Sequence, residues 1–401
     1  LITTLLEMCF SNMEGGMEIS LNKIKEDDII KILFAENPGI VIQVKNKHKE
    51  EVKKILEDAG IGYVKLGKPT EERHILVEKG DATYQFGIDY LRDVWYSTSY
   101  LLDRKQSMNG CAKKRFENYK KQPLEFVFDK SFTGKLSQFD LNPDRRTPTG
   151  IKAAIIREKG TNGEREMAYM LYLAGFDVKD VTMTDLVSGR ETLEDINFIV
   201  FCGGFSNSDV LGSAKGWAGA FLFNPKAKAA LDNFYARKDT LSLGVCNGCQ
   251  LMIELNLINP DFTKKAKMLH NDSHKFESKF VGVTVPMNRS VMFGSLSGSK
   301  LGIWVAHGEG KFSLPYHEDK YNVVLKYSYD EYPGNPNGSD YSVAGLASPD
   351  GRHLAMMPHL ERSCFPWQNA YYPADRIKND QITPWMEAFV NARKWIEMNK
   401  K

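Results

Sequence analysis

The stretch Leu241–Met252 constrains the fold of this chain more than any other part of the sequence. An apolar run leads directly into Cys246, glycines stand two positions before and two positions after this cysteine, and an apolar helical pattern begins at once. Small residues on both sides permit a sharp turn that lifts the cysteine above a sheet. The helix that follows would direct free amides and its dipole at the sulfur, which stabilises the attacking thiolate. The stretch therefore predicts an α/β fold with a nucleophile elbow.

Two other interpretations of this cysteine stay open from the residues alone. Cys246 can be a buried structural cysteine beside a chance pair of glycines. Cys246 and Cys249 also form a C-x-x-C pair, and a thioredoxin-like dithiol suits the start of a helix equally well. A structural zinc would need two more ligands nearby, and the sequence has no second cysteine pair to supply them. No metal site is expected.

A cysteine nucleophile needs a base and a group that orients the base. His359 and Glu361 supply both groups after the apolar run 356–358. They are two positions apart, so on an extended segment their side chains point to the same side. Five of the 8 histidines of the chain have an acidic residue two positions on, and His359 is one of them. We therefore expect Cys246, His359 and Glu361 to act together.

Two glycine-rich loops follow apolar runs and complete the candidate site. Gly203, Gly204 and Phe205 end one run, and bare backbone amides there can approach a developing oxyanion. The second loop, 306–312, contains His307. An isolated glycine pair is more often a tight turn, and the position of these pairs after apolar strands is what favours a role in a site.

The first part of the chain, residues 1–104, alternates helical and extended patterns. Apolar runs predict strands at 39–44 and 63–66. Helical spacing predicts helices over 47–59 and 88–104. This part is an α/β segment in which no catalytic motif is visible.

The rest of the chain changes character twice. Residues 105–150 carry basic clusters and a run with Pro and Gly, which fits a phosphate-binding patch or, because charge runs are usually solvated, a surface linker. The third part, 151–401, opens with strands expected at 153–156, 176–181 and 198–201. With the elbow, this order predicts a doubly wound, mostly parallel α/β sheet, in which ligands bind beyond the carboxyl ends of the strands.

Composition excludes several classes of protein. The formal net charge of +2 is too near zero to indicate a nucleic-acid or membrane-surface partner. The apolar runs are far shorter than the roughly 18 residues of a membrane-spanning segment. Six cysteines in 401 residues are too sparse for a disulfide framework and favour a reducing, cytoplasmic setting. The chain opens at Leu1 in an apolar stretch without a basic leader, so we expect part of a longer protein and no secretory signal.

The candidate residues resemble the signature of class I (triad) glutamine amidotransferases. That signature has Gly244, Cys246, Gly248 and Gln250 at alternating positions and a distant His-x-Glu, here His359-Leu360-Glu361. Further stretches, in the same order, resemble the long single-chain phosphoribosylformylglycinamidine synthase family: Arg157–Asn162, Cys202–Ser206, Asp209–Gly212, His307–Gly310, Asn335–Ser339 and Met356–His359. Leu360 departs from the proline that is common between His and Glu in the family, but both functional side chains remain.

The resemblance implies a flavodoxin-like glutaminase domain and a role for each residue. Cys246 would attack the carboxamide carbon of glutamine, His359 would pass a proton to the departing ammonia, and Glu361 would orient the imidazole. The resemblance also implies an oxyanion hole formed by amides near Gly204, Phe205 and Asn247. The full set of substrate-binding residues that it implies is Gly203, Gly204, Phe205, Asn247, Gln250 and His307. Gln250 would hold either the glutamyl group or the elbow, and a purely structural role for His307 stays open.

The resemblance also implies what lies outside the chain. Residues 1–104 are loosely similar to the end of the aminoimidazole ribonucleotide synthetase-like synthase domain. The missing N-terminal synthase part would be the partner, and would use ATP and magnesium to amidate formylglycinamide ribonucleotide with ammonia from glutamine. No phosphate-binding loop of the G-x-x-x-x-G-K-[ST] kind occurs in the chain. We therefore expect glutaminase chemistry alone here, with no cofactor in this part.

Two alternatives to this function remain. The same fold could carry a cysteine peptidase or a chaperone-like hydrolase, although the histidine of those relatives usually follows the cysteine closely and His359 does not. A non-catalytic docking module is the other possibility. The joint presence of Cys246, His359 and Glu361 argues against it, because a decayed site would be expected to lose at least one.

Overall fold

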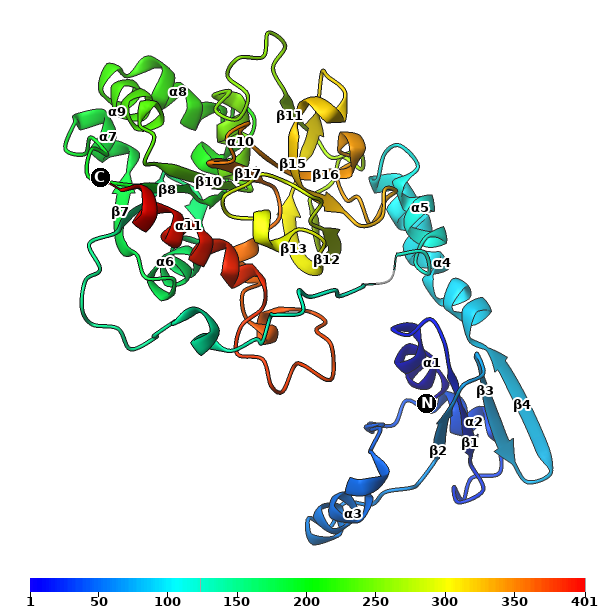
Figure 1. Cartoon of the computed structure of the whole chain (residues 1–401). Coiled ribbons are helices and arrows are strands. Elements are labelled where there is room, and N and C mark those ends of the chain that lie inside the picture. The colour runs from blue at the N-terminus through cyan, green and yellow to red at the C-terminus, as the bar shows by residue number, and fades with distance from the viewer. Residues whose placement is uncertain (123, 401) are drawn as a thin grey trace. The chain divides into compact units, whose positions relative to one another are not determined.

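The computed structural model describes residues 1–122 and 124–400. They form two compact units, Leu1–Lys105 and Gln106–Lys401 (Figure 1). Each unit is built around its own cluster of buried apolar side chains. Within the described residues, no helix combines the length and the apolar content that crossing a bilayer requires.

The first unit is a four-stranded sheet with helices. Its strands lie in the order β2 (Gly67–Thr70), β1 (Gly16–Ser20), β3 (His74–Lys79) and β4 (Ala82–Gly87), and only β1 and β3 are parallel. Its helices are α1 (Ile2–Phe10), α2 (Ile29–Phe34), α3 (Lys49–Asp58) and α4 (Ile88–Gln106). The helices predicted over 47–59 and 88–104 are thereby confirmed.

Both strands predicted in this unit are wrong. Residues 39–44 and 63–66 have no regular structure, and strand β2 begins only at Gly67. Ile40 is 90% exposed and Ile42 is 58% exposed. A β-branched run becomes a strand only when a neighbouring strand pairs with it and covers it, and no strand of the described residues does so here.

The segment expected to be a linker belongs to the second unit. It contains α5 (Cys111–Glu117), and Phe132 and Leu141 join the large apolar core. The Arg145 guanidinium donates to the Asp177 carboxylate and to nearby backbone carbonyls. Part of the segment therefore packs on the sheet domain, through Phe132, Leu141 and Arg145, where the sequence pattern suggested a solvated connection.

The second unit is organised by a nine-stranded sheet. Its order is β13-β12-β15-β16-β17-β10-β8-β5-β7. Strands β17, β10, β8, β5 and β7 are parallel, and the other four extend the sheet in antiparallel fashion. The bounds are β5 Lys152–Arg157, β7 Asp177–Thr182, β8 Phe198–Phe201, β10 Leu241–Val245, β12 Glu277–Thr284, β13 Lys300–His307, β15 Asn322–Tyr327, β16 Val343–Ala347 and β17 His353–Met356.

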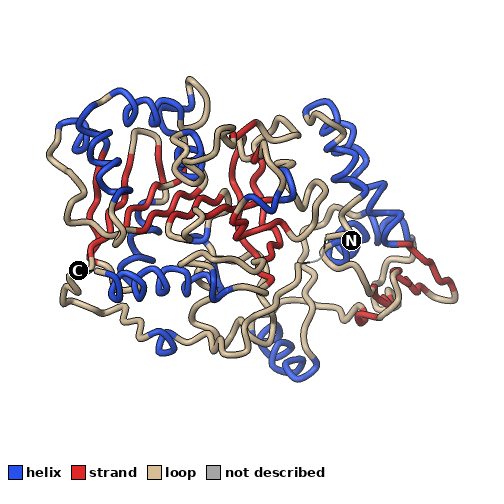
Figure 2. Tube along the Cα trace, turned by 45° about the horizontal axis from the view of Figure 1, so that its top comes forward, coloured by secondary structure: helices blue, strands red, loops and turns tan. Residues whose placement is uncertain are grey.

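Helices cover both faces of this sheet, so the predicted doubly wound α/β fold is confirmed. Figures 1 and 2 show α6 and α11 on one face and α7 to α10 on the other. The bounds are α6 Glu164–Leu173, α7 Met183–Ser188, α8 Lys215–Phe223, α9 Pro225–Ala236, α10 Asn247–Glu254 and α11 Trp385–Asn399. Short pairs join loops to this framework: β6 (Thr161–Asn162) with β9 (Gly203–Gly204), and β11 (Lys267–Leu269) with β14 (Lys311–Ser313).

The two helical layers explain why the central strands are continuous apolar runs. Every residue of β8 and of β10 is buried, because helices cover both sides. The three expected strands at 153–156, 176–181 and 198–201 correspond to β5, β7 and β8. The carboxyl ends of β8, β10 and β17 lie side by side, which places the loops that follow them at one edge of the sheet.

Candidate active site

The predicted elbow is present at Cys246. This residue lies between β10 and α10 with φ 54° and ψ −107°. An L-residue with a bulky side chain rarely adopts a positive φ, and such strain persists only where the surroundings enforce it. Cys246 is 4% exposed, and its thiol donates to the carbonyl oxygen of Ala306 at 3.5 Å.

Two glycines make the turn possible by allowing close packing. A Cβ on Gly244 would lie 2.5 Å from the carbonyl oxygen of Gly248 and 2.6 Å from Sδ of Met252. A Cβ on Gly248 would lie 2.1 Å from the carbonyl oxygen of Phe201. Helix α10 therefore presses against β8 and β10 at distances that no side chain allows.

His359 and Glu361 meet beside the elbow. Nδ1 of His359 donates to Oε1 of Glu361 at 2.7 Å, and both residues are 2% exposed. The amide of His359 donates to the carbonyl oxygen of Trp304 on β13 at 2.8 Å, which fixes the segment. A Cβ on Gly203 would lie 2.9 Å from Cε1 of His359 and 3.3 Å from Cβ of Cys246. Gly203 thus leaves the space in which the histidine and the cysteine approach each other.

The charges around His359 favour its protonated form. Burial alone would lower its pKa, but the Glu361 carboxylate and then the Cys246 sulfur outweigh burial and raise the pKa to about 10. Nε2 of His359 is buried and has no hydrogen-bond partner among the described residues. The arrangement can hold an imidazolium next to the sulfur and leaves Nε2 free to exchange a proton.

Cys249 has the opposite character. It is fully buried, and burial followed by the nearby Cys246 sulfur raises its pKa well above the usual range. A thiol held neutral in apolar surroundings is inert as a nucleophile. Only Cys246 lies in the strained turn, while burial keeps Cys249 neutral, so the geometry disfavours the thioredoxin-like alternative.

The loop Gly203–Phe205 differs at Phe205 from the expected oxyanion hole. The amide of Phe205 donates to the carbonyl oxygen of Gly160 at 2.8 Å, so it is not available to a substrate oxygen. Its side chain is 45% exposed and contacts the ring of Phe276. The first amides of α10, at Asn247 and Gly248, are N-terminal amides that the helix itself leaves unpaired.

Asn247 and Gln250 hold the elbow to its surroundings. The Asn247 side-chain amide donates to Oε1 of Gln250 at 2.9 Å, and Gln250 donates to the carbonyl oxygen of Glu309 at 2.7 Å. The amide of Ser206 donates to Oδ1 of Asn247 at 3.1 Å. Of the two roles expected for Gln250, the contacts favour support of the elbow.

His307 is held neutral beside the site. Asn271 donates to the carbonyl oxygens of Lys275 and His307 through Nδ2. Its Oδ1 therefore faces Nδ1 of His307 at 3.1 Å and accepts a hydrogen bond from this nitrogen. Burial, followed by the charge of His359, lowers the pKa of His307 to about 3. Nε2 is therefore an unprotonated acceptor, buried and without a partner in the described residues.

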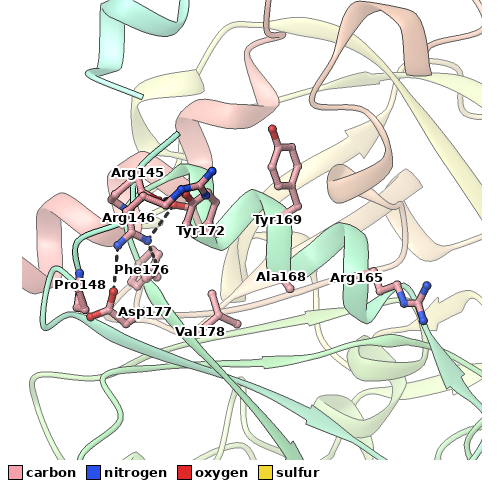
Figure 3. A pocket seen from close by; sticks show the side chains of 10 residues that line it. All are labelled: Arg145, Arg146, Pro148, Arg165, Ala168, Tyr169, Tyr172, Phe176, Asp177 and Val178. Carbon is pink, nitrogen blue, oxygen red and sulfur yellow. Dashed lines mark hydrogen bonds and ion pairs between the residues drawn. The ribbon is translucent and has the colours of Figure 1, made fainter. Parts of the chain in front are cut away.

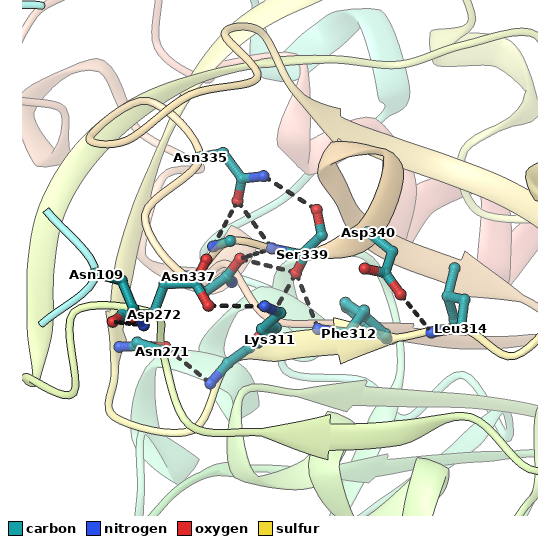
Figure 4. A network of polar contacts seen from close by, with 12 residues as sticks. Asn109, Asn271, Asp272, Lys311, Phe312, Leu314, Asn335, Asn337, Ser339 and Asp340 are labelled. Atoms are coloured by element: carbon teal, nitrogen blue, oxygen red, sulfur yellow. Dashed lines mark hydrogen bonds and ion pairs between the residues drawn. The ribbon is translucent and has the colours of Figure 1, made fainter. Parts of the chain in front are cut away.

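The sequence did not reveal the polar network that supports this corner. Asn335 and Ser339 fasten their own loop and the neighbouring β14, and Lys311 pairs with Asp272 at 2.7 Å (Figure 4). These side chains come from segments far apart in the chain, and loops rich in Asn and Gly carry no periodicity that predicts their partners. Among the described residues, no group of three or more His, Cys, Asp or Glu could hold a metal ion.

Comparisons with known proteins show which family the chain belongs to. Residues 150–396 match the family model of the CobB/CobQ-like glutamine amidotransferase domain. The chain is 37% identical over 425 residues to "Probable phosphoribosylformylglycinamidine synthase, chloroplastic/mitochondrial" from Arabidopsis thaliana, covering 99% of the chain and 29% of that protein. It is 38% identical over 430 residues to "Phosphoribosylformylglycinamidine synthase" from Homo sapiens, covering 98% of the chain and 31% of that protein.

A solved structure, "Structure of PurLQS from Thermotoga maritima", aligns with 63% of this chain and 99% of that chain, at 27% identity and a TM-score of 0.47. The chain spans 29% to 32% of the length of the curated relatives.

Replacing Gly248 tests the close packing of the elbow. We expect Gly248→Ala to lower the free energy of unfolding by about 2 kcal/mol or more, because its Cβ would overlap the Phe201 carbonyl. Gly219→Ala, in α8, is the matched control: its Cβ would meet Phe223 at 3.8 Å, and alanine suits a helix interior. Urea unfolding measures the free energy of unfolding of both variants. Equal stabilities of the two variants would contradict the packing argument.

The raised pKa of His359 predicts a pH dependence of stability. The pKa of His359 is about 10 in the folded chain, above the usual 6.5. Its protonated form therefore adds to the free energy of unfolding fully below pH 6.5, and this contribution is lost as the pH rises through 10. The difference in unfolding free energy between the parent chain and His359→Asn should therefore shrink between about pH 7.5 and pH 10.

The control is another buried histidine. Burial and then the Arg352 charge lower the pKa of His353 to about 4, so the effect of His353→Asn should stay constant over the same interval. A constant difference for His359→Asn as well, measured by urea unfolding at each pH, would show that His359 is not charged in the folded chain.

Proposed function

This chain belongs to the family of CobB/CobQ-like glutamine amidotransferases, and we propose that its second unit hydrolyses glutamine through a thioester on Cys246. The observation that carries the proposal is the strained Cys246 at the start of α10 beside the buried His359–Glu361 pair. A nucleophile, a base and an orienting carboxylate in that arrangement are what acyl transfer needs.

In the first half-reaction, the Cys246 thiolate attacks the carboxamide carbon and a tetrahedral oxyanion forms. We assign its stabilisation to the N-terminal amides of α10 and to the segment Gly203–Gly204, because Gly203 lies against Cys246 and His359. His359 gives its Nε2 proton to the amide nitrogen, the C–N bond breaks, and ammonia leaves the glutamyl thioester. The Glu361 carboxylate keeps the imidazole oriented throughout.

In the second half-reaction, water hydrolyses the thioester. Nε2 of His359, now unprotonated, accepts a proton from the water as its oxygen attacks the carbonyl carbon. The C–S bond then breaks, glutamate leaves, and the pair of sulfur and imidazolium is restored. Nε2 suits this step because it has no hydrogen-bond partner among the residues that the structure describes.

The role of the longer protein extends the same proposal. The named relatives are phosphoribosylformylglycinamidine synthases, and the chain covers less than a third of each. The remainder would bind ATP, magnesium and formylglycinamide ribonucleotide and would receive the ammonia inside the protein. Leu1–Lys105 would belong to the synthase part.

The compartment is also a proposal. Six free cysteines suit a reducing compartment and support a cytoplasmic location. The plant relative is named as chloroplastic/mitochondrial, so the location proposed here differs from the one in that relative's name.

Glutamate release tests the proposed reaction. Cys246→Ala should lower the rate of glutamate release by about a thousandfold or more, because no other group can form the thioester. His359→Ala should lower it by about a hundredfold to ten-thousandfold, the range of general acid–base catalysis. Cys249→Ala, which removes the neighbouring buried thiol, should leave the rate within a few fold.

Coupling to the synthase part is tested in the same assay. Rates should rise when the missing N-terminal part is added with ATP and formylglycinamide ribonucleotide, because uncoupled ammonia release wastes glutamine. Equal rates of glutamate release with and without the added N-terminal part would contradict the coupling to the synthase part. For the preceding test, an active Cys246→Ala variant or an inactive Cys249→Ala variant would contradict the assignment of Cys246 as the nucleophile.

A further inference from the structure

We propose that a groove along α6, away from Cys246, binds a nucleoside phosphate. The groove is open to solvent and has a volume of about 590 Å³. It lies between α6, the start of β7 and residues 145–148 (Figure 3). None of its lining residues belongs to the proposed glutamine site, so the inference does not depend on that function.

One face of α6 forms the length of the groove. Arg165, Ala168, Tyr169 and Tyr172 follow one another at positions i, i+3, i+4 and i+7 and therefore share a face of the helix. This face extends for roughly 10 Å at the helical rise per residue. Ala168 and Val178 give the groove an apolar floor. A ligand here meets an apolar surface that ends in a charged group.

The charges of the groove select an anion. Arg146 and Arg165 lie at opposite ends of it, are exposed, and make no ion pair among the residues that the structure describes (Figure 3). Arg145 is different: its guanidinium donates to Asp177 at 3.1 Å and to the Phe176 carbonyl oxygen at 2.7 Å.

The one carboxylate of the groove is already satisfied. Besides Arg145, Asp177 accepts from the backbone amides of Thr149 and Gly150. Two guanidinium groups therefore remain for a ligand, with no free carboxylate to oppose an anion.

The aromatic side chains select a flat group. Tyr169 is 44% exposed. Its ring and that of Tyr172 lie nearly parallel, with centroids 6.4 Å apart and an interplanar angle of 22°. The ring of Phe365 also lies 6.2 Å from that of Tyr169, and a nucleobase can stack on an aromatic surface of this kind.

Guanidinium groups bind phosphate through paired hydrogen bonds. A base against Tyr169 and a phosphate at one of the two terminal arginines match the length of the groove. The chemistry that fits all of these features is a nucleoside phosphate.

The test uses the 401-residue chain and isothermal titration calorimetry with AMP and ADP. We expect one saturable site with a Kd of about 1 mM or lower. Adenosine alone and inorganic phosphate alone should bind at least about tenfold more weakly, since each keeps only half of the contacts. Binding should weaken as salt increases, because the arginines are exposed.

Variants locate the site. Arg146→Ala and Arg165→Ala together, and Tyr169→Ala separately, should each weaken AMP or ADP binding by about tenfold or more. Lys238→Ala, an exposed cation in the turn before β10, should leave it unchanged. Circular dichroism checks that the variants are folded, which we expect because the replaced side chains are exposed or half-exposed.

The proposal is overturned by either of two results. No saturable heat with AMP or ADP would exclude the nucleoside phosphate, and binding that survives all of the groove variants would place the nucleotide elsewhere. Glutamate release measured on the same variants keeps the two proposals distinguishable, because a groove variant that binds no nucleotide should still release glutamate.

Discussion

The contact between the Gly248 position and the carbonyl oxygen of Phe201 is the constraint on which the site depends. Because α10 approaches β8 at a distance that excludes a Cβ, the chain must reverse within one residue after β10. That reversal forces Cys246 into a positive φ and points the helix amides at its sulfur. The core on both faces of the sheet holds the strain, since β8 and β10 are buried throughout.

The parallel part of the sheet brings the residues of the site together. Strands β8, β10 and β17 end side by side, so Gly203, Cys246 and His359 meet although they are far apart in sequence. Charge decides what they can do. The buried Glu361 carboxylate holds a proton on His359, whereas burial keeps His307 neutral with a free Nε2. Two buried histidines of one site thus carry different charge states: the Glu361 carboxylate keeps His359 protonated, and burial keeps His307 neutral.

The sequence predicted what rests on local pattern, and the structure explains the rest. The elbow and the doubly wound sheet follow from spacing, because strand, turn and helix signals are local. His359 and Glu361 pair as expected, but the expected extended segment is wrong: Glu361 lies in a 3-10 turn, Leu360–Arg362, that follows His359. The use of the Phe205 amide by Gly160 and the clamp of Asn271 on His307 depend on contacts across the fold. The strand predicted at 39–44 is wrong for the same reason, since a strand needs a neighbouring strand to pair with. Part of 106–150 packs on the second unit through aromatic and arginine contacts, which the number of charges in the sequence does not predict.

The central claim is that Cys246 is a nucleophile made competent by its strained turn and by His359. The most direct measurement is to incubate the chain with 6-diazo-5-oxo-norleucine, a glutamine mimic that traps nucleophilic cysteines, and to identify the modified peptide by mass spectrometry. The account predicts one adduct, on Cys246, that is absent in Cys246→Ala and forms more slowly in His359→Ala. An adduct on Cys249, or no adduct at all, would contradict it.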